Sequence, residues 1–289
     1  TKEKNMKIGT VTIKKLVCDV TSALRVKGLA EYSAMSGYTV NSAYKEHFAA
    51  LRSSDTASES TCLFRKELNG SKIKCSTKSK LGHANDCASD GEHYYVVKGK
   101  SGSDTVEIEC FNYDLTHYKT YLYKANHALG EPLKNLTNIE SIGNGWFIVG
   151  AGTIYAVCYK FSASNEFTEV YRVKLPNTSG LKEGRREDYD ISGQGICYRN
   201  NALYKIYTYK KPTEAHTKCN DIVKYNFPGN SPSFSGTASV DSIYAYDRSD
   251  IQTFEMEGIS FSESGNLFVS ANVVSLEGEA DSIYQISLS

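Results

Sequence analysis

Residues 254–270 read FEMEGISFSESGNLFVS, and this stretch holds the unit from which the chain is built. An inner segment around Gly258-Ile259-Ser260 is followed by the turn Gly265-Asn266 and by the run Leu267-Phe268-Val269-Ser270. Gly-Asn between two apolar runs is a residue pair that reverses the chain in a tight hairpin. The stretch therefore predicts two antiparallel strands joined by a short turn.

Four earlier segments repeat this order of inner segment, turn and strand. They open at Gly28-Leu29-Ala30, Ala84-Asn85-Asp86, Asn138-Ile139-Glu140 and Gly195-Ile196-Cys197. Their turn signals are Ser36-Gly37, Asp90-Gly91, Asn144-Gly145 and Asn200-Asn201. Each module continues with further aromatic or β-branched runs. Repeats of about 55 to 60 residues that contain strands and no helical pattern indicate a β-propeller.

We predict an all-β fold, a five-bladed β-propeller that occupies residues 1–289 as one domain. Its blades are expected at about residues 20–78, 79–130, 131–178, 186–245 and 250–289, the last completed by residues 5–16. The alternating run Lys7–Ile13 belongs to no module, whereas the fifth module ends at Ser289 without an outer strand. Because a ring of blades leaves an open edge unless its ends pair, we expect the N-terminal strand to close the last blade.

Composition excludes several classes of function. Lys and Arg total 33 and Asp and Glu total 33, so no net charge draws the protein to nucleic acid or to an anionic membrane. The chain has no apolar run of the length that spans a bilayer, and we expect a monomer without a transmembrane segment. The eight cysteines form no CxxC pair and several lie in apolar strand patterns, which favours mostly reduced core thiols.

A ring of polar residues is the candidate site. In a propeller the inner strands line a central channel, so the residues that precede the small position of each module should lie at one level around it. These residues are Lys27, His83, Thr137, Gln194 and Glu257.

Two interpretations of this ring stay open. The polar groups either satisfy one another and channel water, or bind a ligand at the channel mouth with Asn85 and Asp86 nearby. In the second case Glu257 and His83 are the principal ligands of a small molecule or a metal. Glutamate with amides suits calcium, and His83 favours a transition metal. No Gly-x-Ser-x-Gly, HExxH or P-loop motif is present.

The run Gly82-His83-Ala84-Asn85-Asp86, continued at Asp90-Gly91 and Tyr94-Tyr95-Val96, resembles a blade opening of the helveticin J-like and teichoic-acid biosynthesis protein C-like bacterial propellers. Gln194-Gly195-Ile196 and Glu255-Met256-Glu257-Gly258-Ile259 are similar to later blades there. This resemblance covers residues 80–289 and implies an extracellular or cell-envelope bacterial protein. Glu257-Gly258-Ile259 also resembles gluconolactonase-type propellers, in which a glutamate binds a divalent cation for lactone hydrolysis.

Three functions are therefore expected from the sequence. The first is a noncatalytic, secreted or cell-surface propeller that binds a cell-envelope glycan or another small polar ligand at the channel mouth. The second is a metal-dependent hydrolase or lyase of the gluconolactonase type, with Glu257 and His83 at the metal. The third is a structural interaction module of a larger protein. Enzymatic activity stays open at this point.

Overall fold

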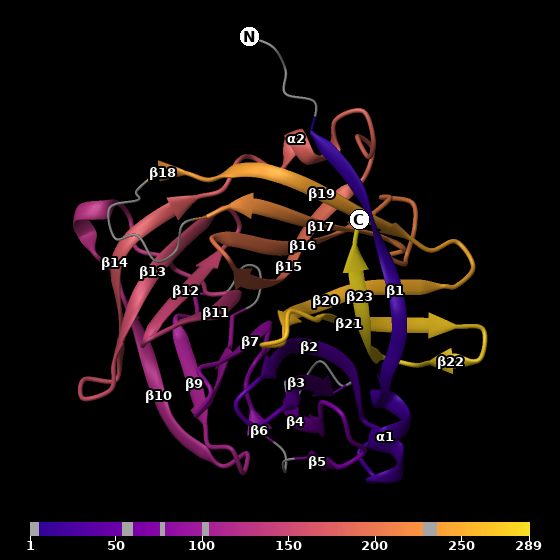
Figure 1. Cartoon of the computed structure of the whole chain (residues 1–289), viewed down its shortest axis with the longest axis horizontal. Coiled ribbons are helices and arrows are strands. Elements are labelled where there is room, and N and C mark those ends of the chain that lie inside the picture. The colour runs from indigo at the N-terminus through magenta and orange to yellow at the C-terminus, as the bar shows by residue number, and fades with distance from the viewer. Residues whose placement is uncertain (1–5, 54–59, 76–78, 100–103, 228–235) are drawn as a thin grey trace.

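The computed structural model describes residues 6–53, 60–75, 79–99, 104–227 and 236–289. Strands dominate this part of the chain, and they form three sheets that curl around a common centre (Figure 1). None of the described helices has the length and apolar character needed to cross a membrane.

The first sheet comes from residues 32–80. Its antiparallel path runs through β2 (Tyr32–Asn41), β3 (Glu46–Ser53), β4 (Ser60–Glu67) and β5 (Ile73–Cys75), and β6 (Ser79–Lys80) pairs with the other end of β4. The inner strands β2, β3 and β4 are almost wholly buried, whereas β5 is partly exposed. Burial thus falls from the centre of the molecule outward.

The second sheet joins two antiparallel sets of four strands. The first set is β7 (Asp86–Ser89), β8 (Tyr94–Val97), β9 (Glu107–Phe111) and β10 (His117–Lys124). The second set is β11 (Asn138–Gly143), β12 (Trp146–Ala151), β13 (Ile154–Phe161) and β14 (Glu166–Lys174), with the short β18 (Gly236–Thr237) beside β14. A parallel pairing of the outer strands β10 and β14 makes them one sheet. A one-turn 3₁₀ helix, η1 (His127–Leu129), lies between the two sets.

The third sheet has the same construction and contains both ends of the described chain. One set is β15 (Asp190–Arg199), β16 (Ala202–Lys210), β17 (Cys219–Asn226) and β19 (Ser239–Asp247). The other is β20 (Thr253–Phe261), β21 (Leu267–Ser275), β23 (Ser282–Leu288) and β1 (Lys7–Asp19), with β22 (Gly278–Glu279) beside β21. The N-terminal strand β1 pairs antiparallel with β23 and parallel with β19. The predicted pairing of the N-terminal strand with the last unit is therefore confirmed.

Five inner strands meet at the centre of the fold. β2, β7, β11 and β15 each lie against the next, and β20 lies against both β15 and β2, so these strands form a closed ring. The number of hydrogen-bonded sheets is three and not five, because the parallel contacts between outer strands fuse neighbouring sets.

Glycines let these inner strands approach each other closely. A Cβ added at Gly37 would lie 2.3 Å from Cys87 Sγ, and one at Gly195 would lie 2.9 Å from Gly258 Cα. Such separations are shorter than van der Waals contact. The expectation that small residues allow the strands to converge is thus met at the hub.

Gly258→Ala tests this convergence. The new methyl carbon would lie 2.4 Å from Tyr38 Cβ and 3.1 Å from the Tyr38 backbone nitrogen, so β20 and β2 would have to separate. We expect a loss of about 1 to 3 kcal/mol in the free energy of unfolding, measured by urea denaturation. Gly152→Ala is a poor control because of its positive φ, whereas Gly236→Ala meets nothing within 4 Å and should change stability little. Equal stability of the two variants would contradict the close approach.

The first module differs from its prediction. Gly28-Leu29-Ala30 does not open an inner strand but lies in the turn between a short helix, α1 (Val20–Val26), and β2. Asp19 caps α1 by accepting the Ser22 N–H at 2.8 Å. Ser36-Gly37 is not the hairpin turn either. It lies inside β2 at a β-bulge between Met35 and Gly37, and the chain reverses after Asn41.

The other four hairpins form where the sequence predicts them. Positive φ angles occur at Gly91, at Asn144-Gly145, at Asn200-Asn201 and at Gly265. Asn and Gly adopt this conformation at low cost, which explains why these pairs mark the turns. All eight cysteines are free thiols, and six of them are buried, in line with reduced core cysteines.

Candidate functional site

A cavity of about 660 Å³ opens beside the hub, between the sets that begin with β7, β11 and β15. Four predicted site residues line it, namely His83, Asn85, Thr137 and Gln194. The cavity is also lined by Lys205 and Tyr207 of β16 and by Ser192 and Gly193 of β15. No Asp or Glu occurs among the described residues that line it. The lining therefore offers hydrogen-bond donors and positive charge without a carboxylate.

Asp86 lies below this cavity and ties three inner strands together. Its Oδ2 accepts the Asn138 side-chain amide at 3.1 Å, the Ile139 N–H at 3.2 Å and the Ile196 N–H at 3.4 Å. Its Oδ1 accepts the Cys87 N–H at 3.0 Å. The carboxylate on β7 thus holds β11 and β15, and it is fully buried.

Two physical effects oppose each other at Asp86. Burial raises the pKa of this carboxyl group to about 7, whereas the four N–H donors act to lower it. All four partners are donors, so the ionised form satisfies each of them and the protonated form would leave its own O–H without an acceptor among them. The hydrogen-bond pattern therefore favours the anion.

Asn138 links Asp86 to a lysine at the cavity wall. Its side-chain nitrogen donates to Asp86 and to the Gln194 carbonyl oxygen at 2.8 Å. Its side-chain oxygen accepts the Tyr155 hydroxyl at 2.9 Å and Lys205 Nζ at 3.3 Å. Lys205 Nζ donates further to the Tyr155 hydroxyl and to the Gly152 carbonyl oxygen, the latter at 3.1 Å. A continuous polar chain therefore runs from the buried anion to the cavity.

Lys205 is an unusual cation because its hydrogen bonds are all with uncharged oxygens, and its Nζ also lies 5.1 Å from the Tyr155 ring centroid and 5.4 Å from that of Tyr207. It is only 1% exposed, and no ion pair with a described residue includes it. Burial lowers the pKa of its ammonium group to about 7, and the field of Asp86 acts in the opposite direction.

Gly193 leaves space at the end of the Lys205 side chain. A Cβ at this position would lie 2.8 Å from Lys205 Cε and 3.0 Å from Nζ, so any side chain here would crowd the ammonium group. Gly193 is itself exposed and lines the cavity. The absence of its side chain places the positive group at the cavity wall.

The structure does not bring all predicted site residues together. Lys27 is the exposed C-cap of α1 and lines a separate cavity beside Glu46, Arg65 and Lys74. It is not equivalent to Gln194 or Glu257, and its place in the predicted ring was wrong. The position in the first unit that corresponds to Glu257 is Ser36, since each is the extra residue of a β-bulge in its inner strand.

Asn85 and Thr137 meet directly, because the Asn85 amide donates to the Thr137 carbonyl oxygen at 2.8 Å. Gln194 lies in the bulged part of β15, and its amide nitrogen lies 3.5 Å from Thr208 Oγ1 and 3.4 Å from Glu255 Oε1. These contacts connect the cavity with the neighbouring strands β16 and β20.

Glu257 is not among the described residues that line this cavity. Its Oε1 accepts the Asn272 amide at 2.7 Å, and Asn272 also contacts the Met35 backbone. Burial and the nearby Glu255 raise the pKa of Glu257 well above its usual value, which favours the neutral acid. Within the described ranges no three His, Cys, Asp or Glu side chains gather as a metal site would require. The calcium or transition-metal site at Glu257 and His83 stays a prediction, because Glu257 is bonded to Asn272 whereas His83 lines the cavity.

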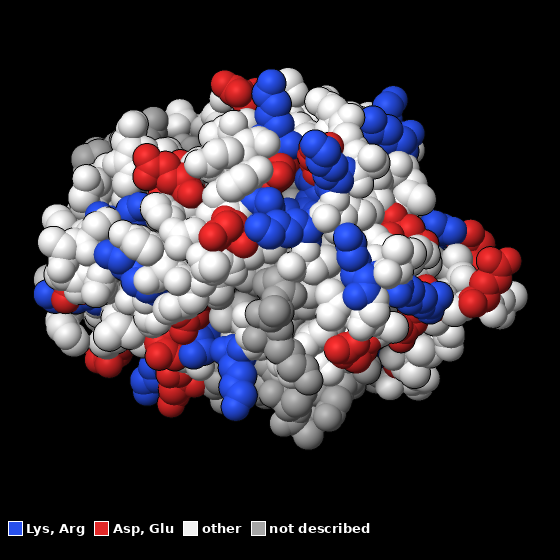
Figure 2. All heavy atoms as spheres, turned by 90° about the horizontal axis from the view of Figure 1, so that it is seen from below, with Lys and Arg blue, Asp and Glu red and all other residues white. Residues whose placement is uncertain are grey.

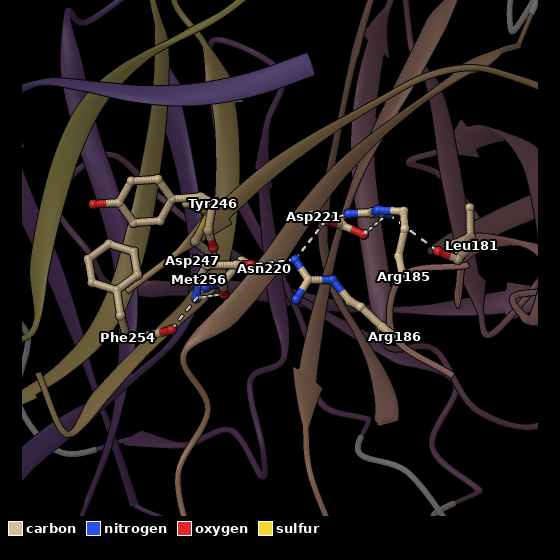
Figure 3. A network of polar contacts seen from close by, with 9 residues as sticks. All are labelled: Leu181, Arg185, Arg186, Asn220, Asp221, Tyr246, Asp247, Phe254 and Met256. Carbon is tan, nitrogen blue, oxygen red and sulfur yellow. Dashed lines mark hydrogen bonds and ion pairs between the residues drawn. The ribbon is translucent and has the colours of Figure 1, made fainter. Parts of the chain in front are cut away.

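A network of polar contacts around two arginines ties the segment after residue 182 to neighbouring strands (Figure 3). Arg185 makes two bonds to the buried Asp221 of β17, at 2.9 and 3.0 Å. Arg186 contacts both Asp221 and Asp247, and its guanidinium lies 4.6 Å above the Tyr209 ring. These residues follow the short helix α2 (Ser179–Lys182), whose preceding residue, Thr178, lines the cavity. The network fixes this segment to the strands behind it.

The outer surface shows no comparable concentration of charge on the face drawn in Figure 2. Lys and Arg alternate there with Asp and Glu, in keeping with the balanced composition. Lys205 is the one Lys or Arg among the described residues that line the cavity beside the hub.

Sequence reasoning missed Lys205, Asn138 and Tyr155. A signal for Lys205 was present, since Leu203-Tyr204-Lys205-Ile206-Tyr207 places the lysine on the same face as Leu203 and Tyr207, which are buried. A lysine on the inward face of a strand is rare unless it has a polar environment or a function. Nothing local marks Asn138, whose role depends on contacts with β7, β13 and β16.

Comparisons with known proteins place the fold but not the function. No protein-family model matches the chain, and no curated protein does so either. Among solved structures, a glutaminyl cyclase from Myxococcus xanthus is similar, with a TM-score of 0.53, 14% identity and 98% of both chains covered. An exo-1,5-α-L-arabinanase from a bovine ruminal metagenomic library has a TM-score of 0.49 at 7% identity, covering 90% of this chain and 93% of its own.

A calcium-binding regucalcin from Agrobacterium tumefaciens is a more distant neighbour, with a TM-score of 0.41 at 9% identity, covering 96% of this chain and 79% of its own. At these identities the likeness concerns the fold alone. The chain has an all-β fold of the propeller type.

Proposed function

We propose that this protein binds a small polar ligand with an anionic group in the 660 Å³ cavity beside the hub, with Lys205 as the group that attracts the anion. The observation that carries the proposal is a buried lysine without an ion-pair partner among the described residues, at the wall of a cavity whose described lining lacks carboxylates. A buried charge is costly unless something pairs with it. A ligand carboxylate would supply that pair.

The polar groups around Lys205 suit this role. His83, Asn85, Thr137 and Gln194 surround the cavity with side chains that can donate and accept hydrogen bonds. They are the residues for which the sequence predicts ligand binding, and we keep them as the proposed binding residues. Asp86 supports the site from below by fixing β7, β11 and β15.

Several finer expectations belong to this proposal. We count the four-strand sets and the first sheet as five blades, with the last closed by β1. The resemblance to helveticin J-like propellers, the noncatalytic role, the extracellular or envelope location and the monomeric state stay predictions. The gluconolactonase-type hydrolase is the weaker alternative because Glu257 is not among the described residues that line the cavity with His83.

The proposal is tested by thermal unfolding of the full chain at pH 6.5 with a panel of small carboxylates and their uncharged amides or alcohols. Uronic acids, hydroxy acids and N-acyl amino acids make up the panel. We expect at least one carboxylate to raise the melting temperature in proportion to the logarithm of its concentration, whereas its uncharged counterpart does not. At one hundred times its Kd such a ligand adds about 2.7 kcal/mol of stability.

Lys205→Met is the variant that assigns the effect to the site, because it removes the charge and keeps an unbranched side chain. Lys224→Met is its matched control, since Lys224 lies on the adjacent strand β17 and pairs with Asp241 outside the cavity. The carboxylate should stabilise the control and not the Lys205 variant. Equal stabilisation of both variants, or no response to any carboxylate, would overturn the proposal.

A further inference from the structure

A second cavity, of about 330 Å³, lies beside the first and has a different chemistry. Thr208, Thr217, Thr253 and Ser192 contribute four hydroxyl groups to its lining, and Glu255 and Asp190 contribute carboxylates. Lys210 and His216 also line it. Side chains of both charge signs are present, so no ionic group is favoured as strongly as at Lys205.

The two cavities lie on opposite sides of the β15–β16 strand pair and adjoin at its hub edge, where Ser192 is exposed. Ser192 lines both of them. On β16, Tyr207 lines the first cavity and the next residue, Thr208, lines the second, because neighbouring side chains of a strand point to opposite sides. Gln194 of the first cavity reaches Thr208 Oγ1 and Glu255 Oε1 of the second with its amide nitrogen.

The second cavity is also held in shape. The His216 ring lies 3.0 Å from Thr253 Oγ1 through Nδ1 and 2.9 Å from the Gln252 amide nitrogen through Nε2. The Phe254 N–H donates to the Thr217 carbonyl oxygen at 2.8 Å. The segment that contains His216 and Thr217 is thus attached to β20, and the cavity does not depend on a free loop.

We infer that the two cavities form one elongated binding site for an acidic glycan, with a uronic acid unit next to Lys205 and a neutral sugar unit among the hydroxyl and carboxylate groups around Glu255. This inference rests on the proposed function of the first cavity. Carboxylate and amide oxygens accept pairs of sugar hydroxyls, and threonine and serine hydroxyls both donate and accept. The cationic wall of the first cavity and the hydroxyl-rich wall of the second would then bind different sugar units of the same molecule.

Calorimetric titration at pH 6.5 tests this arrangement with two probes. One is glucuronic acid, and the other is a disaccharide in which glucuronic acid is joined to galactose. We expect the disaccharide to bind with a Kd about tenfold lower, since only it reaches the second cavity. A disaccharide of two neutral hexoses should bind more weakly than either.

The double variant Glu255→Gln with Thr217→Val assigns the gain to the second cavity. Both changes keep the shape of the side chain, and glutamine keeps an oxygen that can accept the Gln194 amide. The tenfold advantage of the disaccharide should disappear in this variant, whereas the affinity for glucuronic acid stays the same. Glu277→Gln, at an exposed position outside both cavities, is the matched control and should keep the advantage.

The outcomes separate the two proposals. Equal affinity for glucuronic acid and the disaccharide would overturn the elongated site and leave the anion-binding function intact. Binding of other carboxylates but of neither sugar would overturn the glycan assignment. If no carboxylate binds at all, the proposed function fails and this inference fails with it.

Discussion

Replacing Lys205 with methionine should stabilise the protein by about 2 to 4 kcal/mol at pH 7, as measured by urea denaturation. The reason is the cost of burying an ammonium group, since a pKa lowered to about 7 from its usual value of 10.5 means that folding disfavours its charged form. Methionine removes the charge, and the Tyr155 hydroxyl still donates to Asn138. The Asn138 side-chain oxygen, the Tyr155 hydroxyl and the Gly152 carbonyl oxygen each lose a bond from the lysine, and the first two keep the bond between them.

The pH dependence identifies the cause of this gain. Between about pH 7 and 10.5 the unfolded chain holds a proton on Lys205 that the folded protein lacks, so the stability of the unmodified protein rises with pH. The advantage of the variant should therefore be largest below pH 7 and shrink by about 1.4 kcal/mol per pH unit above it. Lys224→Met, which breaks an ion pair, should not stabilise at any pH. A destabilised Lys205 variant, or a gain independent of pH, would show that the lysine is not a costly buried charge.

A stability gain combined with a loss of ligand binding would indicate that Lys205 serves function at the expense of stability. Residues that only support a fold rarely behave in this way, whereas binding sites often do so. The two measurements on one variant thus connect the energetics of the hub to its proposed role.

Asp86→Ala should have the largest destabilising effect, about 3 to 5 kcal/mol. The substitution removes the acceptor for the Ile139 and Ile196 N–H groups, which would then be buried without a partner. It also releases β11 and β15 from β7 at the centre of the ring. Urea denaturation measures the loss, and the cavity above the hub should lose its ligand response as the strands shift.

Asp86→Asn separates hydrogen bonding from charge. An amide oxygen in the Oδ2 position can still accept from Asn138, Ile139 and Ile196, so we expect less than half of the loss seen with alanine. Asp114→Ala provides the control, because Asp114 is exposed and bonds only to Thr116 two residues away. If alanine at position 86 were tolerated as well as alanine at position 114, the hub would not depend on this carboxylate.

The candidate site could be predicted in part. His83, Asn85, Thr137 and Gln194 line one cavity because their modules repeat with the same register, and the repeat is visible in the sequence. The prediction that Lys27 belongs to the ring was wrong, because Lys27 is the C-cap of helix α1, whose N-cap is Asp19, and does not lie in an inner strand. Glu257 belongs to the ring, but its carboxyl group contacts Asn272. This contact joins two strands, so it could not be predicted from the pattern of one strand.

Features that depend on residues close together in the chain could be predicted from the sequence. Turn pairs such as Asn144-Gly145 and apolar alternation specify each hairpin locally, and the unmatched strand at the N-terminus indicates how the last unit closes. Tertiary structure alone decided which polar groups meet at the hub. Bulges at Ser36 and Glu257 shift the alternation of side chains, and the Asp86–Asn138–Lys205 chain joins strands far apart in sequence. Local sequence patterns do not show which residues of two separate strands lie side by side, because that alignment is set by how closely the two backbones pack.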